Sequence, residues 1–202
     1  MKTVIVTGGM GSGKSAVCAC LKAQGVPVYD SDSRTKSLYD RDPALVDRME
    51  AALGTGLRSP EGRLDRSRLA GIIFSDPAKK AVVEALVHPA VLADFRRWKR
   101  WQRPKGWTYG PVPFVVLESA IILSCPVFDG VGDRTVLVDA DESVRAARAA
   151  ARDGSDLEAV LQRIRRQSFD LSRVDAVLRN DGTLEDLPAE VDRVFLNLFL
   201  SL

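Results

Sequence analysis

The sequence predicts an α/β fold, in which a parallel sheet is covered by helices and the chain carries a helical insertion. Short apolar or β-branched runs recur along the chain, and a polar or helical stretch follows each of them. This alternation is typical of parallel strands joined by helical crossovers. The segment from about 33 to about 107 is rich in helical pattern and too long for a simple crossover. We therefore expect it to form an inserted helical subdomain.

The expected elements follow in a regular order. The strands are TVIV at 3–6, VPVYD at 26–30, PFVVLE at 113–118, RTVLVDA at 134–140 and, with a weaker pattern, DAVLRND at 175–181. A helical stretch follows the first strand. Two arginine-rich helices, 143–152 and 156–167, follow the fourth strand and are joined by Asp-Gly-Ser. The glycine in this joint and the polar surface of the pair suit a mobile lid over about 143–170.

The composition is that of an ordinary globular chain. Its 202 residues are enough for one domain with an insertion. The 29 basic and 27 acidic residues leave a net charge of +2, so nothing demands an acidic polymer as partner. We find no signal-type leader and no apolar run near the roughly 20 residues of a membrane span, and we expect a cytoplasmic protein without a membrane partner. The three cysteines lack metal-site spacing, and we interpret them as small buried apolar residues.

A phosphate-binding loop is predicted directly after the first strand. Gly8-x-x-x-x-Gly13-Lys14-Ser15 matches the complete pattern, which arises by chance in about one chain in a hundred of this length. Glycines let backbone N–H groups converge on an anion at the positive end of the following helix. The Lys14 amine can reach the β- and γ-phosphates, and the Ser15 hydroxyl can ligate magnesium. Motors, switches and kinases share this loop, so it does not define a function by itself.

Carboxylates at the ends of two strands are candidates for the chemistry. Asp30 and Asp32 follow the second strand, whose carboxyl end lies on the same edge of a parallel sheet as the loop. A kinase needs a carboxylate there to orient and deprotonate the acceptor hydroxyl. The alternative is that both aspartates cap a helix beginning near Ser33. Glu118 ends the third strand, where it either supports a metal, directly or through water, or has a structural role.

Arginines of the expected lid form one stripe. Arg145, Arg148 and Arg152 are spaced three and four residues apart, which places them on one face of a helix. A closing lid would bring some of them onto the transferred phosphate. A solvated basic face is the alternative.

The segment 96–107, RRWKRWQRPKGW, mixes basic and aromatic residues, as nucleic-acid surfaces do. The residues at helical spacing are Val91, Phe95, Trp98 and then Trp101 or Gln102. We therefore interpret the tryptophans as packed against the protein, and we expect no nucleic-acid partner.

The single histidine, His88, precedes Pro89 at an expected break between two helices. A structural role is one interpretation. The other is that a break in the insertion holds a phosphate of the substrate.

Together these motifs resemble the dephospho-coenzyme A kinase family, which performs the last step of coenzyme A synthesis. The similarity runs over nearly the whole chain. Its segments are TGGMGSGKS, VYDSD, LVHPAV, VVLESAIIL, RAAARD and DAVLRNDG. The His-Pro pair, the Arg-x-x-x-Arg-Asp lid and the Asp-x-x-x-x-Asn segment, in that order, are much more specific than the loop.

The resemblance implies a P-loop kinase with a five-stranded parallel core, an inserted helical domain that helps to hold the coenzyme, and a lid. It implies transfer of the γ-phosphate of MgATP to the ribose 3′-hydroxyl of dephospho-coenzyme A, and we expect no protein partner. Asp32 would be the base or orienting carboxylate, while Lys14 and Arg148 would stabilise the transferred group. The residues implied for ATP are Gly9, Met10, Gly11, Ser12, Gly13, Lys14, Ser15, Ala16, Arg148, Arg152 and Asn180, the last beside the adenine. Those implied for the acceptor are Asp32, Lys36 and His88, and those for Mg²⁺ are Ser15 and Glu118.

Some positions depart from the family pattern. Ser124 stands where the family has the acidic residue of a Pro-Leu-Leu-Phe-Glu segment, so that acidic residue is lost while Glu118 remains. Lys36 stands where arginine is commoner, which keeps the charge but loses the bidentate fork.

Other functions remain as alternatives. Another small-molecule kinase, such as a nucleoside monophosphate kinase, fits the loop, but the insertion and the His-Pro pair argue against it. A nucleotide-dependent switch would use Asp129-Gly-Val-Gly132 as a DxxG element, yet this lies late in the chain and no NKxD motif occurs. A nucleic-acid-binding ATPase would rest on the basic and aromatic segment alone.

Overall fold

The computed structural model describes residues 1–102 and 113–200 of the chain. These residues form two compact units. The first comprises Met1–Asp30 and Gln102–Leu202, and the second is Ser31–Trp101. The end of the insertion expected at about 107 lies outside the described residues.

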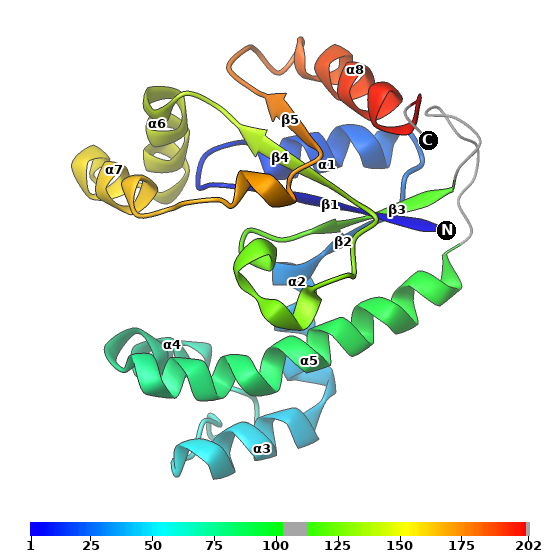
Figure 1. The fold of residues 1–202 in the computed structure, drawn as a ribbon. Helices are drawn as coiled ribbons and strands as arrows, with labels where there is room; N and C mark the ends of the chain where they lie inside the picture. The colour runs from blue at the N-terminus through cyan, green and yellow to red at the C-terminus, as the bar shows by residue number, and fades with distance from the viewer. Residues whose placement is uncertain (103–112, 201–202) are drawn as a thin grey trace. The chain divides into compact units, whose positions relative to one another are not determined.

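The first unit is built on a five-stranded parallel sheet with the strand order β2-β3-β1-β4-β5 (Figure 1). The strands are β1 (Lys2–Gly8), β2 (Val28–Asp30), β3 (Phe114–Glu118), β4 (Arg134–Asp139) and β5 (Ala176–Arg179). The parallel α/β fold predicted from the sequence is therefore confirmed. β1 is central, and its residue Val4 pairs with Val116 on one side and Arg134 on the other. All of β1 after its first residue is buried, as expected for a strand covered on both faces.

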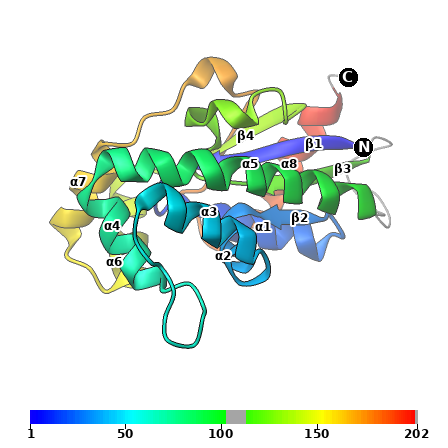
Figure 2. The same cartoon turned by 90° about the horizontal axis from the view of Figure 1, so that it is seen from below.

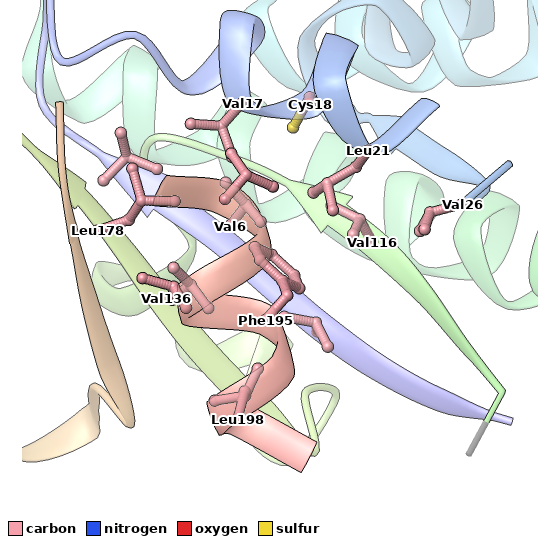
Figure 3. Close-up of a cluster of buried hydrophobic side chains, with 14 of the residues drawn as sticks. Val6, Val17, Cys18, Leu21, Val26, Val116, Val136, Leu178, Phe195 and Leu198 are labelled. Atoms are coloured by element: carbon pink, nitrogen blue, oxygen red, sulfur yellow. The ribbon is translucent and has the colours of Figure 1, made fainter. Parts of the chain in front are cut away.

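Helices α1 (Lys14–Ala23) and α8 (Leu187–Leu200) pack on one face of this sheet. Figure 3 shows side chains of these two helices among those of the strands: Val17, Cys18, Leu21, Phe195 and Leu198. The Phe195 ring also stacks on the Phe114 ring of β3, with 5.9 Å between their centroids. Burying each of the valine, leucine and phenylalanine side chains among these residues contributes about 1.5–3 kcal/mol. The packing fixes α1, and with it the loop that precedes α1, at the centre of the sheet.

Helices α6 (Glu142–Asp153) and α7 (Leu157–Arg165) follow β4 and form a hairpin (Figures 1 and 2). Gly154 ends α6 with a left-handed backbone (φ 59°), and the Asp156 carboxylate caps α7 by accepting from the Ala159 N–H. Small side chains let the helices approach closely. The buried cluster between them is Ala146, Ala149, Val160 and Ile164. That the hairpin moves as a lid remains a prediction.

Short 3₁₀ turns lie in the connection between β3 and β4 and in the connection between α7 and β5. They are η1 (Ile122–Ser124), η2 (Pro126–Phe128) and η3 (Leu171–Arg173). Within residues 1–102 and 113–200, no helix combines the length and the apolar character needed to cross a bilayer.

The second unit has helices as its main elements (Figure 2). They are α2 (Ser31–Arg41), α3 (Pro43–Leu53), α4 (Arg66–Ser75) and α5 (Pro77–Trp101). The long helix α5 contacts the other three. Its buried Asp94 accepts two hydrogen bonds from the Arg34 guanidinium of α2, at 2.9 and 2.7 Å, so the buried charge is paired.

The predicted break at His88 and Pro89 is wrong, because α5 continues through both residues. Proline inside a helix costs about 3 kcal/mol or more, since it removes a hydrogen bond and its ring meets the carbonyl four residues earlier. Val87 and Val91 lie on either side of the proline and are buried. Continuing the helix keeps both in the core of this unit, and we attribute the tolerance of Pro89 to that burial.

The aromatic residues near the end of α5 behave differently from one another. Trp98 is partly buried, and its ring lies 6.0 Å from that of Phe95, as the predicted packing requires. Trp101 is 77% exposed, so the prediction that it packs is wrong. The buried stripe of α5 ends at Phe95, and Trp101 lies more than one turn beyond it. Trp107 lies outside the described residues.

Candidate phosphate-binding and transfer site

The loop between β1 and α1 has the geometry of an anion-binding turn. It leaves the central strand and enters α1 at Lys14, with Gly13 as the N-cap residue at φ 92°. Gly11 is also left-handed, at φ 73°. Residues with side chains rarely adopt such angles. The first N–H groups of a helix lack carbonyl partners within it and are the usual donors to an anion bound in such a loop.

The ammonium group of Lys14 is folded over this loop. Its Nζ atom donates hydrogen bonds to the carbonyl oxygens of Gly8 at 2.8 Å and Gly9 at 3.1 Å. Lysine carries a compact charge with three donors on a flexible stem. The positive charge therefore already lies at the loop where phosphates are expected.

Oxygen-bearing side chains meet beside the start of α1. The Ser15 hydroxyl donates to the Glu118 carboxylate at 3.2 Å, and Asp30 pairs with Glu118 in the β2–β3 ladder. Burial, and then the charge of Asp30, raises the pKa of Glu118. Burial also raises the pKa of the neighbouring Cys18 thiol, which is hydrogen-bonded to Glu118. The prediction that Cys18 is buried is therefore confirmed, but its surroundings are not wholly apolar, because they include the Glu118 carboxylate.

This group has few protein ligands for a metal. Among the described residues, no cluster of three or more histidine, cysteine, aspartate or glutamate side chains could hold an ion alone. A cation beside Ser15 and Glu118 would need phosphate oxygens and water to complete its coordination. That requirement is characteristic of Mg²⁺ bound with a nucleotide.

Asn180 fastens the end of β5 to the loop. Its side-chain Nδ2 donates to the Ser12 carbonyl oxygen at 2.8 Å, and its backbone N–H donates to the Asp139 carbonyl at 2.8 Å. A Cβ atom on Gly13 would lie only 2.1 Å from Nδ2. Glycine at position 13 is therefore required by this contact as well as by its backbone angle.

The arginines of α6 separate into two groups. Arg148 donates to the carbonyl oxygens of Asn180 at 2.7 Å and Gly182 at 3.1 Å, which holds its guanidinium close to the loop. Arg152 instead pairs with Asp153, its neighbour on the same helix, at 2.7 Å. Both arginines are predicted to bind ATP. Of the two, Arg148 contacts Asn180, whereas Arg152 is paired with Asp153.

Two residues at the loop are missing from the predicted site. Arg145 donates to the Met10 carbonyl oxygen, and Gln167 accepts from the Met10 N–H. The sequence contains a signal for Arg145, which belongs to the arginine stripe. It contains none for Gln167, a polar residue beyond the end of α7 with no motif around it.

The remaining predicted residues belong to the second unit. Asp32 lies in the first turn of α2, which begins at Ser31, so it is inside the helix and not at the cap position expected from a start near Ser33. Its charge still suits the positive end of the helix. Lys36 is exposed on the same helix. Burial lowers the pKa of His88 on α5, which favours its neutral form at pH 7.

The structure also places two other sequence features, the segment 129–132 and Ser124. Asp129–Gly132 precedes β4 and therefore lies at the opposite edge of the parallel sheet from the loop, which excludes a switch element that senses its phosphates. Ser124 ends η1, where its hydroxyl donates to the Ile121 carbonyl at 2.8 Å.

Comparison with known proteins points to one family. A profile of the dephospho-CoA kinase family matches residues 2–186 of the chain. A dephospho-CoA kinase from Porphyromonas gingivalis is 39% identical over 176 residues, which cover 87% of this chain and 82% of that protein. The crystal structure of a Thermus thermophilus protein superposes with a TM-score of 0.76 at 31% identity, covering 99% of this chain and 96% of that one. The dephospho-CoA kinase from Campylobacter jejuni, at 18% identity, shares the fold with a TM-score of 0.64 and covers 98% of both chains.

Proposed function

The chain belongs to the dephospho-CoA kinase family, and we propose that it transfers the γ-phosphate of ATP, held on residues 8–15, to the ribose 3′-hydroxyl of dephospho-CoA. ATP-dependent phosphorylation of dephospho-CoA is the activity of this family, and the products are ADP and CoA. One observation carries the proposal in this chain. The Lys14 ammonium and the hydrogen-bonded pair of Ser15 and Glu118 lie at the same phosphate-binding loop.

The residues beside the loop fit a magnesium ion bound together with the nucleotide. Mg²⁺ prefers oxygen ligands, keeps several waters and uses one or two carboxylates with substrate phosphates. Ser15 and Glu118 would supply the hydroxyl and the carboxylate, the latter directly or through water. The buried Glu118 and the adjacent Asp30 concentrate negative charge that a cation would compensate. When bound, the ion neutralises charge on the phosphate oxygens.

The transfer needs positioned charges more than covalent chemistry. In this proposal Lys14 and Arg148 stabilise the charge on the γ-phosphoryl group. The Asp32 carboxylate orients the ribose 3′-hydroxyl and accepts its proton as that oxygen bonds to the γ-phosphorus. The bond from the γ-phosphorus to the bridging oxygen breaks, and ADP leaves.

The second unit is proposed to bind the coenzyme, and the α6–α7 hairpin is proposed to act as the lid. Lys36 would meet a phosphate of the acceptor through charge. His88 would contribute a hydrogen bond, since its lowered pKa favours the uncharged ring. Arg152 would join the ATP site only if its guanidinium left Asp153, its neighbour on α6. We expect the reaction to take place in the cytoplasm.

A coupled ADP-release assay tests the function directly. We expect turnover with dephospho-CoA, ATP and Mg²⁺, and loss of turnover when Mg²⁺ is chelated. Adenosine and nucleoside monophosphates serve as competing acceptors. Faster turnover with either of them than with dephospho-CoA would reject the proposed acceptor in favour of another small-molecule kinase.

A further inference from the structure

We propose that Arg145 and Gln167 are positioning residues that latch the α6–α7 hairpin to the phosphate-binding loop and thereby shape the loop for ATP. The inference rests on the proposed function, because it concerns how the same loop is held. Arg145 lies near the start of α6, and Gln167 lies two residues beyond the end of α7. The two residues thus join both helices of the hairpin to one point of the loop.

That point is the backbone of Met10. Gln167 Oε1 accepts a hydrogen bond from the Met10 N–H at 2.9 Å, and Arg145 Nε donates to the Met10 carbonyl oxygen at 3.0 Å. Arg145 Nη2 also donates to Gln167 Oε1 at 2.9 Å, which closes a ring of three hydrogen bonds. Both backbone groups of one loop residue are therefore bonded to the hairpin.

The surroundings of Arg145 favour this role over direct contact with a phosphate. Its side chain is only 12% exposed, and its Nη1 lies 3.7 Å from the Asp139 carboxylate at the end of β4. The forked guanidinium is thus shared among a carbonyl, an amide oxygen and a carboxylate. Arginine suits this arrangement because its donors have a fixed planar geometry.

The hairpin approaches the phosphate-binding loop so closely that the loop positions 9 and 11 have no room for a side chain. A Cβ atom on Gly9 would lie 1.9 Å from Arg145 Nη2 and 2.8 Å from Gln167 Oε1. A Cβ atom on Gly11 would lie 2.0 Å from the Arg145 carbonyl oxygen. Gly9 is outside the left-handed region, so its need for glycine comes from the latch and not from its backbone angle.

The latch has a consequence for binding. The Met10 N–H donates to Gln167, so the loop backbone at Met10 is held before a ligand binds. A loop held in its binding shape loses less conformational freedom when the ligand arrives. Release of the latch should therefore weaken ATP binding and loosen the hairpin together.

We would measure two quantities on Arg145→Ala, Gln167→Ala and the double variant. The first is the affinity for a non-hydrolysable ATP analogue with Mg²⁺, measured by calorimetry. The second is amide hydrogen exchange of residues 9–13 and 142–167 in the nucleotide-free protein. We expect each single change to weaken binding on the order of tenfold and to speed exchange in both segments. The double variant should be little worse than either single one, because both changes break the same ring.

Matched controls lie on α7, where Gln162 and Arg163 are exposed. Gln162→Ala and Arg163→Ala should leave affinity and exchange within twofold of the parent. Arg145→Lys keeps the charge but not the fork, and it should behave like Arg145→Ala. Gly9→Ala should break the ring without altering either side chain, and should reproduce the faster exchange.

The proposal is overturned if Arg145→Ala and Gln167→Ala both bind the analogue within twofold of the parent. It is equally overturned if their effects are independent and additive, or if exchange in the loop is unchanged. None of these measurements uses dephospho-CoA. A chain that failed to phosphorylate dephospho-CoA but lost nucleotide affinity as expected would reject the proposed function and support the latch.

Discussion

The side-chain amide of Asn180 donates a hydrogen bond to the main-chain carbonyl oxygen of Ser12 at 2.8 Å. Asn180 is 5% exposed, so this bond joins the end of β5 to the phosphate-binding loop in a place that water hardly reaches. Removing one partner of a buried hydrogen bond destabilises a protein mainly because the other partner is left buried without a hydrogen bond. The shape of the loop therefore depends on a residue far from it in sequence.

We expect Asn180→Ala to lower the free energy of unfolding by about 1–3 kcal/mol, because the Ser12 carbonyl oxygen loses its donor. Binding of ATP should weaken as well. Urea denaturation and calorimetry on one preparation would measure both effects. Gln162→Ala, at an exposed position of α7, is the control. Equal stability of the two variants would contradict the importance of the Asn180 bond.

Lys14→Ala should nearly abolish turnover and leave the fold intact. The Lys14 ammonium contacts backbone carbonyls of a surface loop, so its removal changes stability little, whereas transfer loses a positive charge at the phosphates. ADP release and melting temperature test the two parts. Lys22→Ala, at the other end of α1, should retain activity. If turnover persisted in the Lys14 variant, the loop lysine would have no part in the mechanism.

Arg148→Ala should lower kcat much more than it weakens ATP binding. The guanidinium is held by two carbonyl oxygens near the loop, where it can meet charge that develops during transfer. Arg148→Lys should restore little of the lost kcat, because lysine lacks the forked guanidinium that donates to both carbonyl oxygens. Steady-state kinetics and calorimetry separate the two effects. A loss confined to ATP affinity would make Arg148 a contact to the bound nucleotide only.

Glu118→Gln should raise the Mg²⁺ concentration needed for half-maximal activity by about 10- to 100-fold, because it removes a charged oxygen ligand or the anchor of a water ligand. The melting temperature should not fall, since burial and the charge of Asp30 both disfavour the Glu118 carboxylate. Glu190→Gln, at a distant site on α8, provides the control. An unchanged Mg²⁺ requirement would remove Glu118 from the metal site.

Asp32→Asn should retain ATP binding and most stability while turnover falls. The amide is isosteric, and Asp32 lies at an exposed position in the first turn of α2. Assistance by a general base is typically worth about 10²- to 10⁴-fold. The paired measurement is Asp30→Asn, which changes the neighbouring carboxylate at the end of β2. If the Asp30 variant were the slower of the two, the catalytic carboxylate would be misassigned.

Part of this protein is determined by the sequence alone. The parallel α/β fold follows from local patterns, because buried strands and the loop from Gly8 to Ser15 consist of neighbouring residues with strong preferences. Glu118 is likewise predictable as a residue at the loop, since it ends a strand and parallel strands share their carboxyl edge.

Tertiary structure decided what local patterns could not. A proline within a helical pattern predicts a break, yet burial on both sides of Pro89 keeps α5 continuous. The arginine stripe does not reveal that Arg145 holds Met10 while Arg152 pairs with Asp153. Gln167 carries no signal, because its partner lies at the other end of the chain. Hydrogen bonds between segments that are distant in sequence depend on how whole helices and strands pack. That packing cannot be predicted from any single stretch of residues.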